Sequence, residues 1–103
     1  MELLEGKVLN AIRQSQYQQL DLFLRHKYNI HAMTKDGRNG LFIALDIANP
    51  RKRRRMIRFC LDHGLNPLHK EHTYGYTPLH EAVARQQLDS IQLLLAHVGG
   101  EVD

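Results

Sequence analysis

The sequence has 103 residues, of which 43% are apolar and 24% are charged, and its formal net charge at pH 7 is +3. This balance is typical of a folded chain and excludes an intrinsically disordered one, which has fewer apolar residues and a higher net charge. No apolar run approaches the roughly 18 residues of a membrane span, and the acidic start of the chain is unlike a secretory signal. We therefore expect a cytoplasmic or nuclear protein without a membrane span.

Apolar residues recur at helical spacing along the chain and predict three helix pairs, near residues 2–26, 40–63 and 78–97. The first helix has an apolar stripe made by Leu4, Val8, Leu9 and Ile12. The second helix of each pair has apolar residues at i, i+3 and i+4, in the segments 20–24, 57–61 and 91–95.

The helix pairs look like copies of one unit. The segments 11–37, 44–75 and 82–103 each begin with an alanine on a helix and continue through a second, apolar helix. The first two segments then pass through an irregular stretch to a glycine. Such a repeat is typical of solenoids, in which each unit buries its apolar face against its neighbours.

The third repeat opens with the motif Gly75-Tyr76-Thr77-Pro78-Leu79-His80-Glu81-Ala82. Thr77 is suited to cap a helix by accepting an early backbone N–H. Pro78 would follow at the first helical position, where its missing N–H costs nothing. Leu79 and Ala82 lie three residues apart, so we expect both to face inward. Gly75 is suited to a tight turn before the helix.

This motif resembles the ankyrin-repeat signature T-P-L-H-x-A, which recurs about every 33 residues. The residues that form the structural motif are Gly75, Thr77, Pro78, Leu79, His80 and Ala82. The resemblance implies an all-α solenoid of stacked antiparallel helix pairs with short β-hairpin-like turns between the repeats. It also implies that the His80 ring hydrogen-bonds the backbone and holds neighbouring turns together.

Aligned with the ankyrin pattern, the chain is a single domain of three repeats, which cover residues 1–35, 36–73 and 74–103. Repeat two has Asn39-Gly40 where the pattern has Thr-Pro, and we expect Asn39 to cap the helix instead. Repeat two is also longer than the pattern. We place most of the extra length in a basic insertion between its helices, at 48–52, with Arg53–Arg55 opening the second helix.

The last helix has apolar residues that no later repeat in the sequence would cover, namely Ile91, Leu94, Leu95 and Val98. Terminal repeats of solenoids usually present a polar outer face. We expect some of these side chains, but not all, to pack back onto repeat two. The sequence therefore predicts either further repeats or an end that a partner covers, with self-association as one form of cover.

An ankyrin-like solenoid implies that another protein binds on the concave face, which the turns and the first helices form. Carried over by position, the partner-binding residues are Met33, Lys35, Asp36, Arg38, Asp46, Ile47, Glu71, Thr73, Tyr74, Tyr76, Ala84 and Arg85. Tyr and Arg are common at protein interfaces, which favours a scaffold or adaptor. The alternatives are a regulatory inhibitor that docks on an enzyme, and an anion- or nucleic-acid-binding module.

Six of the fourteen Lys and Arg residues lie in one basic run, which comprises Arg51, Lys52, Arg53, Arg54, Arg55 and Arg58. Three interpretations stay open. The run is a solvated loop, a nuclear-import signal in Lys52–Arg55, or a binding site for an acidic protein segment, nucleic acid or an anionic membrane. No recognition helix or stacking surface accompanies it, which argues against sequence-specific binding of nucleic acid.

The sequence offers no set of residues for catalysis. It has no glycine-rich phosphate loop, nucleophile elbow or paired-carboxylate helix. His69 and His72 have ligand-like spacing, but no nearby residues complete a metal site. The single cysteine, Cys60, can form neither an internal disulfide nor a cysteine-based zinc site, and its apolar neighbours predict a buried thiol. We expect no enzyme, cofactor, metal or small-molecule substrate.

Overall fold

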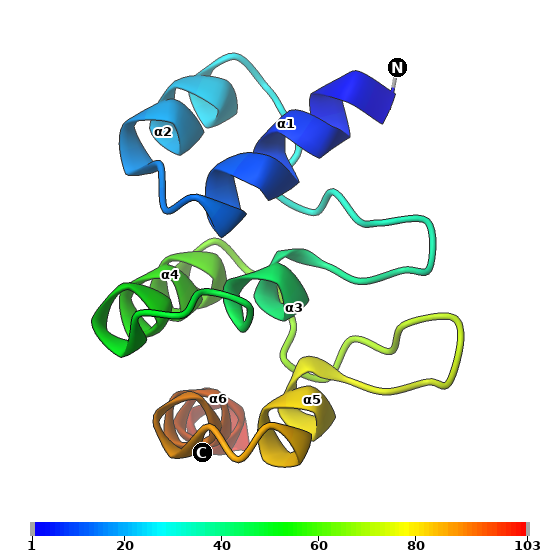
Figure 1. Ribbon diagram of the computed structural model, residues 1–103, viewed down its shortest axis with the longest axis vertical. Helices are drawn as coiled ribbons and strands as arrows, with labels where there is room; N and C mark the ends of the chain where they lie inside the picture. The colour runs from blue at the N-terminus through cyan, green and yellow to red at the C-terminus, as the bar shows by residue number, and fades with distance from the viewer. Residues whose placement is uncertain (1, 103) are drawn as a thin grey trace.

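Three helix pairs stack in chain order (Figure 1). The computed structural model describes residues 2–102, and the side chains of residues 6–99. The helices of this part of the chain are α1 (Glu2–Arg13), α2 (Tyr17–Arg25), α3 (Gly40–Ala44), α4 (Pro50–Asp62), α5 (Pro78–Ala84) and α6 (Leu88–Val102). The predicted all-α class and the three helix pairs are confirmed, although α6 runs to Val102 rather than ending near residue 97.

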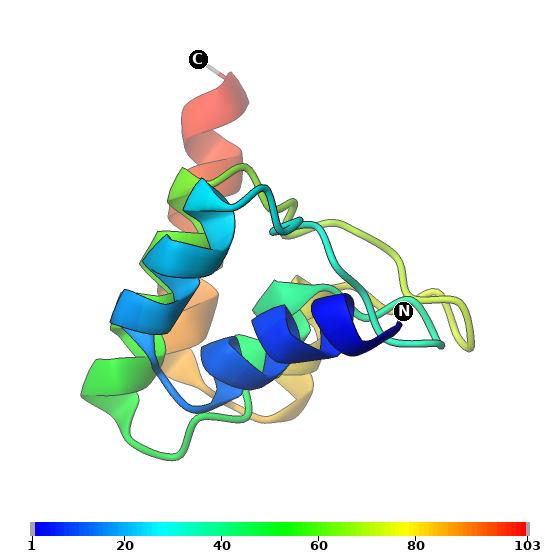
Figure 2. The same cartoon turned by 90° about the horizontal axis from the view of Figure 1, so that it is seen from above.

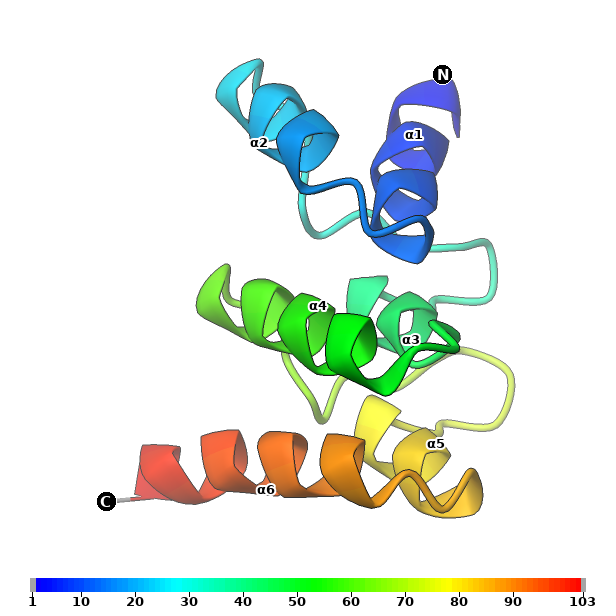
Figure 3. The same cartoon turned by 60° about the vertical axis from the view of Figure 1, so that its left-hand side comes forward.

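The first and second helices of the pairs form two layers. Seen from above, α1, α3 and α5 lie in one layer and α2, α4 and α6 in the other (Figure 2). The loops between repeats project from the edge of the first layer, away from the second helices (Figures 1 and 2). Figure 3 shows that α6 runs alongside α4 and extends beyond it. None of the described helices is long and apolar enough to span a membrane.

One apolar core runs through all three repeats. Fully buried side chains come from each of them, such as Ile12 of α1, Met56 and Ile57 of α4, and Leu94 of α6. The core forms between neighbours, since α1 packs on α3, α3 on α5 and α4 on α6. The side chain of Leu4, predicted to extend the apolar stripe of α1, lies outside the described side chains.

The short helix α3 lies at the centre of the stack, and all five of its residues are buried. Asn39 caps this helix as predicted, because its side-chain oxygen accepts the backbone N–H groups of Leu41 at 3.1 Å and Phe42 at 3.4 Å. A Cβ atom on Gly40 would lie only 2.7 Å from Cδ1 of Ile12. Close packing between repeats one and two therefore explains why glycine follows Asn39.

Cys60 is fully buried in α4, as its apolar neighbours predicted. Burial raises the pKa of its thiol to about 12, because a low-polarity interior disfavours the thiolate. The thiol therefore stays protonated at neutral pH and packs as a small apolar side chain.

The extra residues of repeat two lengthen α4. This helix begins at Pro50 and is capped by Asn49, so residues 50–52 form its first turn. The prediction that they belong to a loop, with Arg53 opening the helix, is wrong. α4 has 13 residues where α2 has 9, and four residues make about one helical turn. The extension therefore adds a turn and keeps the apolar face of α4 in register.

Each loop between repeats closes as a hairpin-like turn, although no β-strand is assigned within residues 2–102. In the first turn, the backbone N–H of Thr34 donates to the carbonyl of Arg38 at 3.0 Å. In the second, the N–H of Glu71 donates to the carbonyl of Tyr76 at 2.8 Å. The two turns thus repeat the same local structure.

The two turns are joined to each other by histidines. The backbone N–H of His72 donates to the carbonyl of Asp36 at 2.7 Å, and Nε2 of His69 lies 2.8 Å from the carbonyl oxygen of Gly37. The prediction that the His80 ring bonds the backbone is confirmed, because Nδ1 of His80 accepts the backbone N–H of Thr77. The prediction that it joins neighbouring turns is wrong, because this bond lies within its own repeat. His69 and His72 therefore have a structural role, which is to hold the two turns together.

We expect Gly37→Ala to destabilise the fold more than Gly75→Ala. Both glycines have a positive φ, +82° and +74°, and this backbone costs other residues about 1–2 kcal/mol. At Gly37 a Cβ atom would also lie 2.5 Å from Cδ2 of His72, and such overpacking adds about 1–3 kcal/mol. At Gly75 no described atom lies within 4 Å. Urea unfolding measures both variants, and equal losses would contradict the tight fit of His72.

Candidate partner-binding surface

The two turns place exposed side chains at one edge of the stack. We name this set the turn surface, and its members are Met33, Lys35, Asp36, Thr73, Tyr74 and Tyr76. The large side chains among them, Met33, Tyr74 and Tyr76, are 39%, 76% and 51% exposed. Exposed aromatic rings offer a large contact area with few rotatable bonds, which suits them to anchor a partner. Their contact with a partner stays a prediction.

Tyr74, Tyr76 and His80 form an aromatic row from the second turn onto α5. The ring centroids of Tyr74 and Tyr76 are 5.5 Å apart, and those of Tyr76 and His80 are 6.0 Å apart. Nδ1 of His80 accepts the backbone N–H of Thr77 at 3.2 Å, and the Thr77 hydroxyl accepts the backbone N–H of His80 at 3.1 Å. This reciprocal cap confirms the role predicted for Thr77 and holds the start of the row.

Glu71 lies beneath the second turn, with only 5% of the residue exposed. Its carboxylate accepts the backbone N–H groups of Thr73, Tyr74 and Tyr76 at 3.0, 2.7 and 3.0 Å. Burial by itself raises the pKa of this carboxyl, but the hydrogen bonds from the turn outweigh burial, and the pKa lies below its ordinary value. An ionised Glu71 therefore stabilises the turn that presents the two tyrosines.

The structure contradicts the prediction that Glu71 and Ile47 face a partner. Glu71 is buried by the hydrogen bonds of its own turn. Ile47 is 7% exposed and belongs to the core, because α3 ends at Ala44 and the chain that follows directs Ile47 inward. Ala84, at the end of α5, is exposed as the prediction requires.

Three charged residues predicted to face a partner, Arg38, Asp46 and Arg85, are engaged within the chain. Arg85 donates to the carboxylate of Asp46 at 2.6 Å and to the carbonyl of Leu45 at 3.0 Å. Glu81 lies 2.9 Å from Arg85 and 3.6 Å from Arg38. The contacts of Arg85 with Asp46 and of Arg38 with Glu81 join repeat two to repeat three.

The residues of the basic run lie on different faces of α4, so one of them is buried and the others are exposed. Arg53 is buried, and it donates to the carbonyl of Ile47 at 2.9 Å and to both carboxylate oxygens of Asp89 at 3.2 Å. Its assignment to a surface patch is wrong, because position 53 lies on the same helix face as the buried Met56 and Ile57. The other members of the run are exposed, namely Arg51, Lys52, Arg54, Arg55 and Arg58.

This arrangement bears on the import-signal interpretation. Lys52–Arg55 is helical and Arg53 is buried. The folded chain therefore does not present four consecutive cations, and a receptor would have to unwind the start of α4 to contact all of them. The cytoplasmic or nuclear location stays a prediction.

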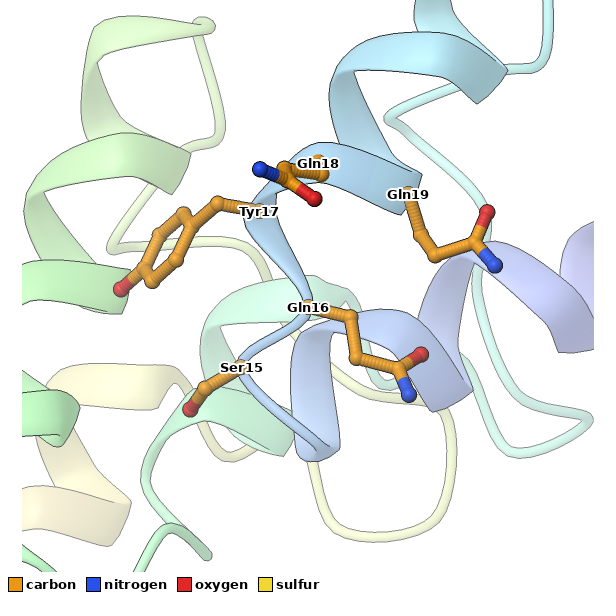
Figure 4. Close-up of a pocket in the computed structure, with 5 residues that line it drawn as sticks. All are labelled: Ser15, Gln16, Tyr17, Gln18 and Gln19. Atoms are coloured by element: carbon orange, nitrogen blue, oxygen red, sulfur yellow. The ribbon is translucent and has the colours of Figure 1, made fainter.

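A hollow of about 370 Å³ lies at the turn between α1 and α2, and it is lined by Ser15, Gln16, Tyr17, Gln18 and Gln19 (Figure 4). Figure 4 shows the Tyr17 ring pointing toward α4, away from Gln16 and Gln19. There it packs edge-on against Phe59, with ring centroids 5.8 Å apart. The lining contains no carboxylate, histidine or cysteine, so the hollow has no general base to activate Ser15.

A second hollow, of about 240 Å³, lies beside the first turn. It is lined by His31, Met33, Asn39, Gly64, Leu65, Asn66 and His69. Met33 belongs to both this hollow and the turn surface, so a segment bound at the turns has a neighbouring recess for a side chain. Among residues 6–99, no group of three or more His, Cys, Asp or Glu side chains is placed to hold a metal ion.

The helices of repeat three expose large aliphatic side chains, since Val83, Leu88 and Leu95 are 55%, 68% and 51% exposed. Of the residues predicted to pack back only in part, Leu94 is fully buried, Ile91 and Val98 are half-buried and Leu95 is exposed. That prediction is confirmed. Sequence reasoning missed the exposure of Val83 and Leu88, since Val83 stands four residues after Leu79, at the spacing of an inward-facing residue.

The fold and the turn surface together define a solenoid of helix pairs with an exposed aromatic surface at its turns. A family model for ankyrin repeats, in three copies, matches residues 8–103. The chain therefore belongs to the ankyrin-repeat family, whose members are generally protein–protein interaction modules and typically not enzymes. No curated protein matches the chain. The residue boundaries between the repeats stay predictions.

We expect Arg53→Ala to lower the free energy of unfolding by about 2 kcal/mol, because it leaves the carbonyl of Ile47 and the carboxylate of Asp89 without their buried donor. Arg54→Ala, on the exposed side of the same helix, should change it by less than about 0.5 kcal/mol. Denaturant titration compares the two variants. Equal effects would show that Arg53 does not join the repeats.

We expect Glu71→Gln to destabilise the fold at pH 7, since the amide brings a donor group toward the backbone donors of the turn. The folded pKa of Glu71 lies below its ordinary value of 4.5. Ionised Glu71 therefore stabilises the fold above that value, and the contribution is lost as the pH falls through the folded pKa. The difference in Tm from wild type should be constant above about pH 5 and shrink as the pH falls below 4.5. Circular dichroism melts measure it, and a difference that stays constant below pH 4.5 would refute the assignment.

Proposed function

We propose that the chain is a scaffold or adaptor module that binds a segment of a partner protein across the turn surface. The observation that carries this proposal is the exposed row formed by Tyr74, Tyr76 and His80, which runs from the second turn onto α5. Membership of the ankyrin-repeat family supports a protein as the partner.

The turn surface combines the groups that an extended segment needs. Tyr74 and Tyr76 offer ring faces and hydroxyl groups, while Lys35 and Asp36 add opposite charges on the neighbouring turn. Met33 leads to the hollow of about 240 Å³. The backbone beneath is already held by the bonds of Glu71 and His72. Because these bonds fix the backbone of the turn, less backbone entropy is lost on association.

An inhibitor that docks on an enzyme would use the same turn surface and differs from an adaptor only in what the bound partner does. Such an inhibitor stays a prediction, as does self-association through the exposed apolar side chains of repeat three. An activity assay on an identified partner separates inhibitor from adaptor.

The double variant Tyr74→Ala, Tyr76→Ala tests the proposal. Partners are captured from cell extract by the immobilised wild-type chain and identified by quantitative mass spectrometry. The affinity of a purified partner is then measured by calorimetry. We expect the double variant to weaken binding by about 10- to 100-fold, because large aromatic anchors dominate interface energies. Alanine keeps the backbone N–H groups that Glu71 binds, so the turn itself should persist.

Leu22→Ala provides the matched control. Leu22 is 50% exposed, close to the 51% of Tyr76, but it lies on α2, in the other helix layer (Figure 2). We expect this variant to bind the partner with wild-type affinity. Full binding by the double tyrosine variant, or an equal loss with Leu22→Ala, would overturn the proposal.

A further inference from the structure

Five cations form a stripe along the exposed face of α4. Arg51, Arg54, Arg55 and Arg58 stand at i, i+3, i+4 and i+7 with Lys52 beside them, and we name this set the basic stripe. The spacing places the arginines on one helix face over two turns, about 10 Å long. These five side chains alone line a hollow of about 490 Å³. The start of α4 lies on the side of the molecule opposite the turns (Figures 1 and 2).

Within the described chain, no side chain of the basic stripe forms an ion pair with an Asp or Glu. Four arginines elsewhere, Arg25, Arg38, Arg53 and Arg85, each form an ion pair with an Asp or Glu. No described carboxylate forms one with the basic stripe. Of these arginines, Arg53 and Arg85 join repeat two to repeat three, whereas the basic stripe has no such partner among the described residues and is available to an anion.

The basic stripe opposes the stability of its own helix. Arg51 with Arg55, and Arg54 with Arg58, are like-charge pairs at i and i+4, which repel each other. The first turn of α4 contains no acidic residue, so the cations also meet the positive end of the helix dipole. Residues that destabilise their own local structure are expected mainly at functional sites. A bound anion would relieve both repulsions.

Arg55 is held in place by stacking. Its guanidinium carbon lies 4.4 Å from the centroid of the Tyr17 ring, and that ring packs in turn against Phe59. No described residue forms a hydrogen bond or ion pair with this guanidinium, so its N–H groups are available to a partner. The guanidinium N–H groups match the two oxygens of a carboxylate.

We propose that the basic stripe is a second docking surface, which binds an acidic segment of a partner protein, rich in Asp or Glu. The inference rests on the proposed function only in taking the partner to be a protein. A stripe of two helical turns has a length that matches a few carboxylates, and arginine is the cation best suited to pair with them. Because it lies opposite the turns, a partner can occupy both surfaces at once.

Membranes and nucleic acids fit this site less well. Helices that bind lipid surfaces have large apolar side chains beside their cations, and none of the large apolar side chains exposed in the described chain lies on α4. Proteins that bind single-stranded nucleic acid stack bases on exposed aromatic rings. The ring beside the basic stripe, that of Tyr17, is already covered by Arg55.

A fluorescein-labelled octaglutamate peptide serves as the probe, and fluorescence anisotropy measures its binding to the full chain. We expect saturable binding that weakens steeply between about 50 mM and about 300 mM NaCl, because exposed charges are screened by salt. The variant Arg51→Gln, Arg54→Gln, Arg58→Gln should bind at least about 10-fold more weakly. Its melting temperature should be unchanged or higher, since like-charge repulsion is removed. Arg55 is left intact because it packs on Tyr17.

The variant Lys7→Gln, Arg13→Gln, Lys27→Gln removes the same charge from exposed positions elsewhere. We expect it to weaken octaglutamate binding by less than about 2-fold. The variant Tyr74→Ala, Tyr76→Ala should bind the peptide like wild type. The octaglutamate assay therefore tests the basic stripe independently of whether the turn surface binds a partner.

Three results would overturn the inference. The first is a wild-type chain that does not bind octaglutamate saturably. The second is an equal loss in the two charge variants, which would mean that net charge alone attracts the peptide. The third is tighter binding of eight-nucleotide oligothymidylate or of phosphatidylserine vesicles than of octaglutamate, which would assign the basic stripe to nucleic acid or to a membrane.

Discussion

No helix pair of this protein buries its apolar face alone, and the rest of the structure depends on that constraint. The helix α3 shows it most clearly, since all five residues are buried where α1, α4 and α5 meet. A helix of this length is not stable in water by itself. It forms because its neighbours cover it, and the turns before α3 and α5 are held at a set spacing because the helices that follow them are packed together.

Apolar contact brings the repeats together, but it is not directional, so polar contacts set how they align. Arg53 of α4 pairs with Asp89 of α6, and Arg85, just after α5, pairs with Asp46, just after α3. Both pairs join repeat two to repeat three. The backbone N–H of His72 joins the two turns. The arrangement of the turn surface is thus determined by residues that do not belong to it.

The features that the sequence predicted correctly are local ones. Helix pairs follow from apolar spacing, and the cap of α5 follows from Thr77-Pro78, because these effects act within a few residues. The burial of Arg53 depends on Asp89, which is 36 residues away in the sequence. No local sequence pattern therefore predicts the Arg53–Asp89 ion pair. A signal did exist, because position 53 shares a helix face with Met56 and Ile57 once the helix begins at Asn49-Pro50. The burial of Glu71 could be recognised only from the folded turn, because the turn's own backbone N–H groups surround its carboxylate.

Burial of α3 also has a consequence for cooperativity. Unfolding this helix would expose apolar surface on the repeats at both sides, so neither could persist in its folded form. The three repeats should therefore melt in one all-or-none transition rather than fray separately. By linkage, a ligand that binds one repeat would protect the whole chain, including repeats that it never touches.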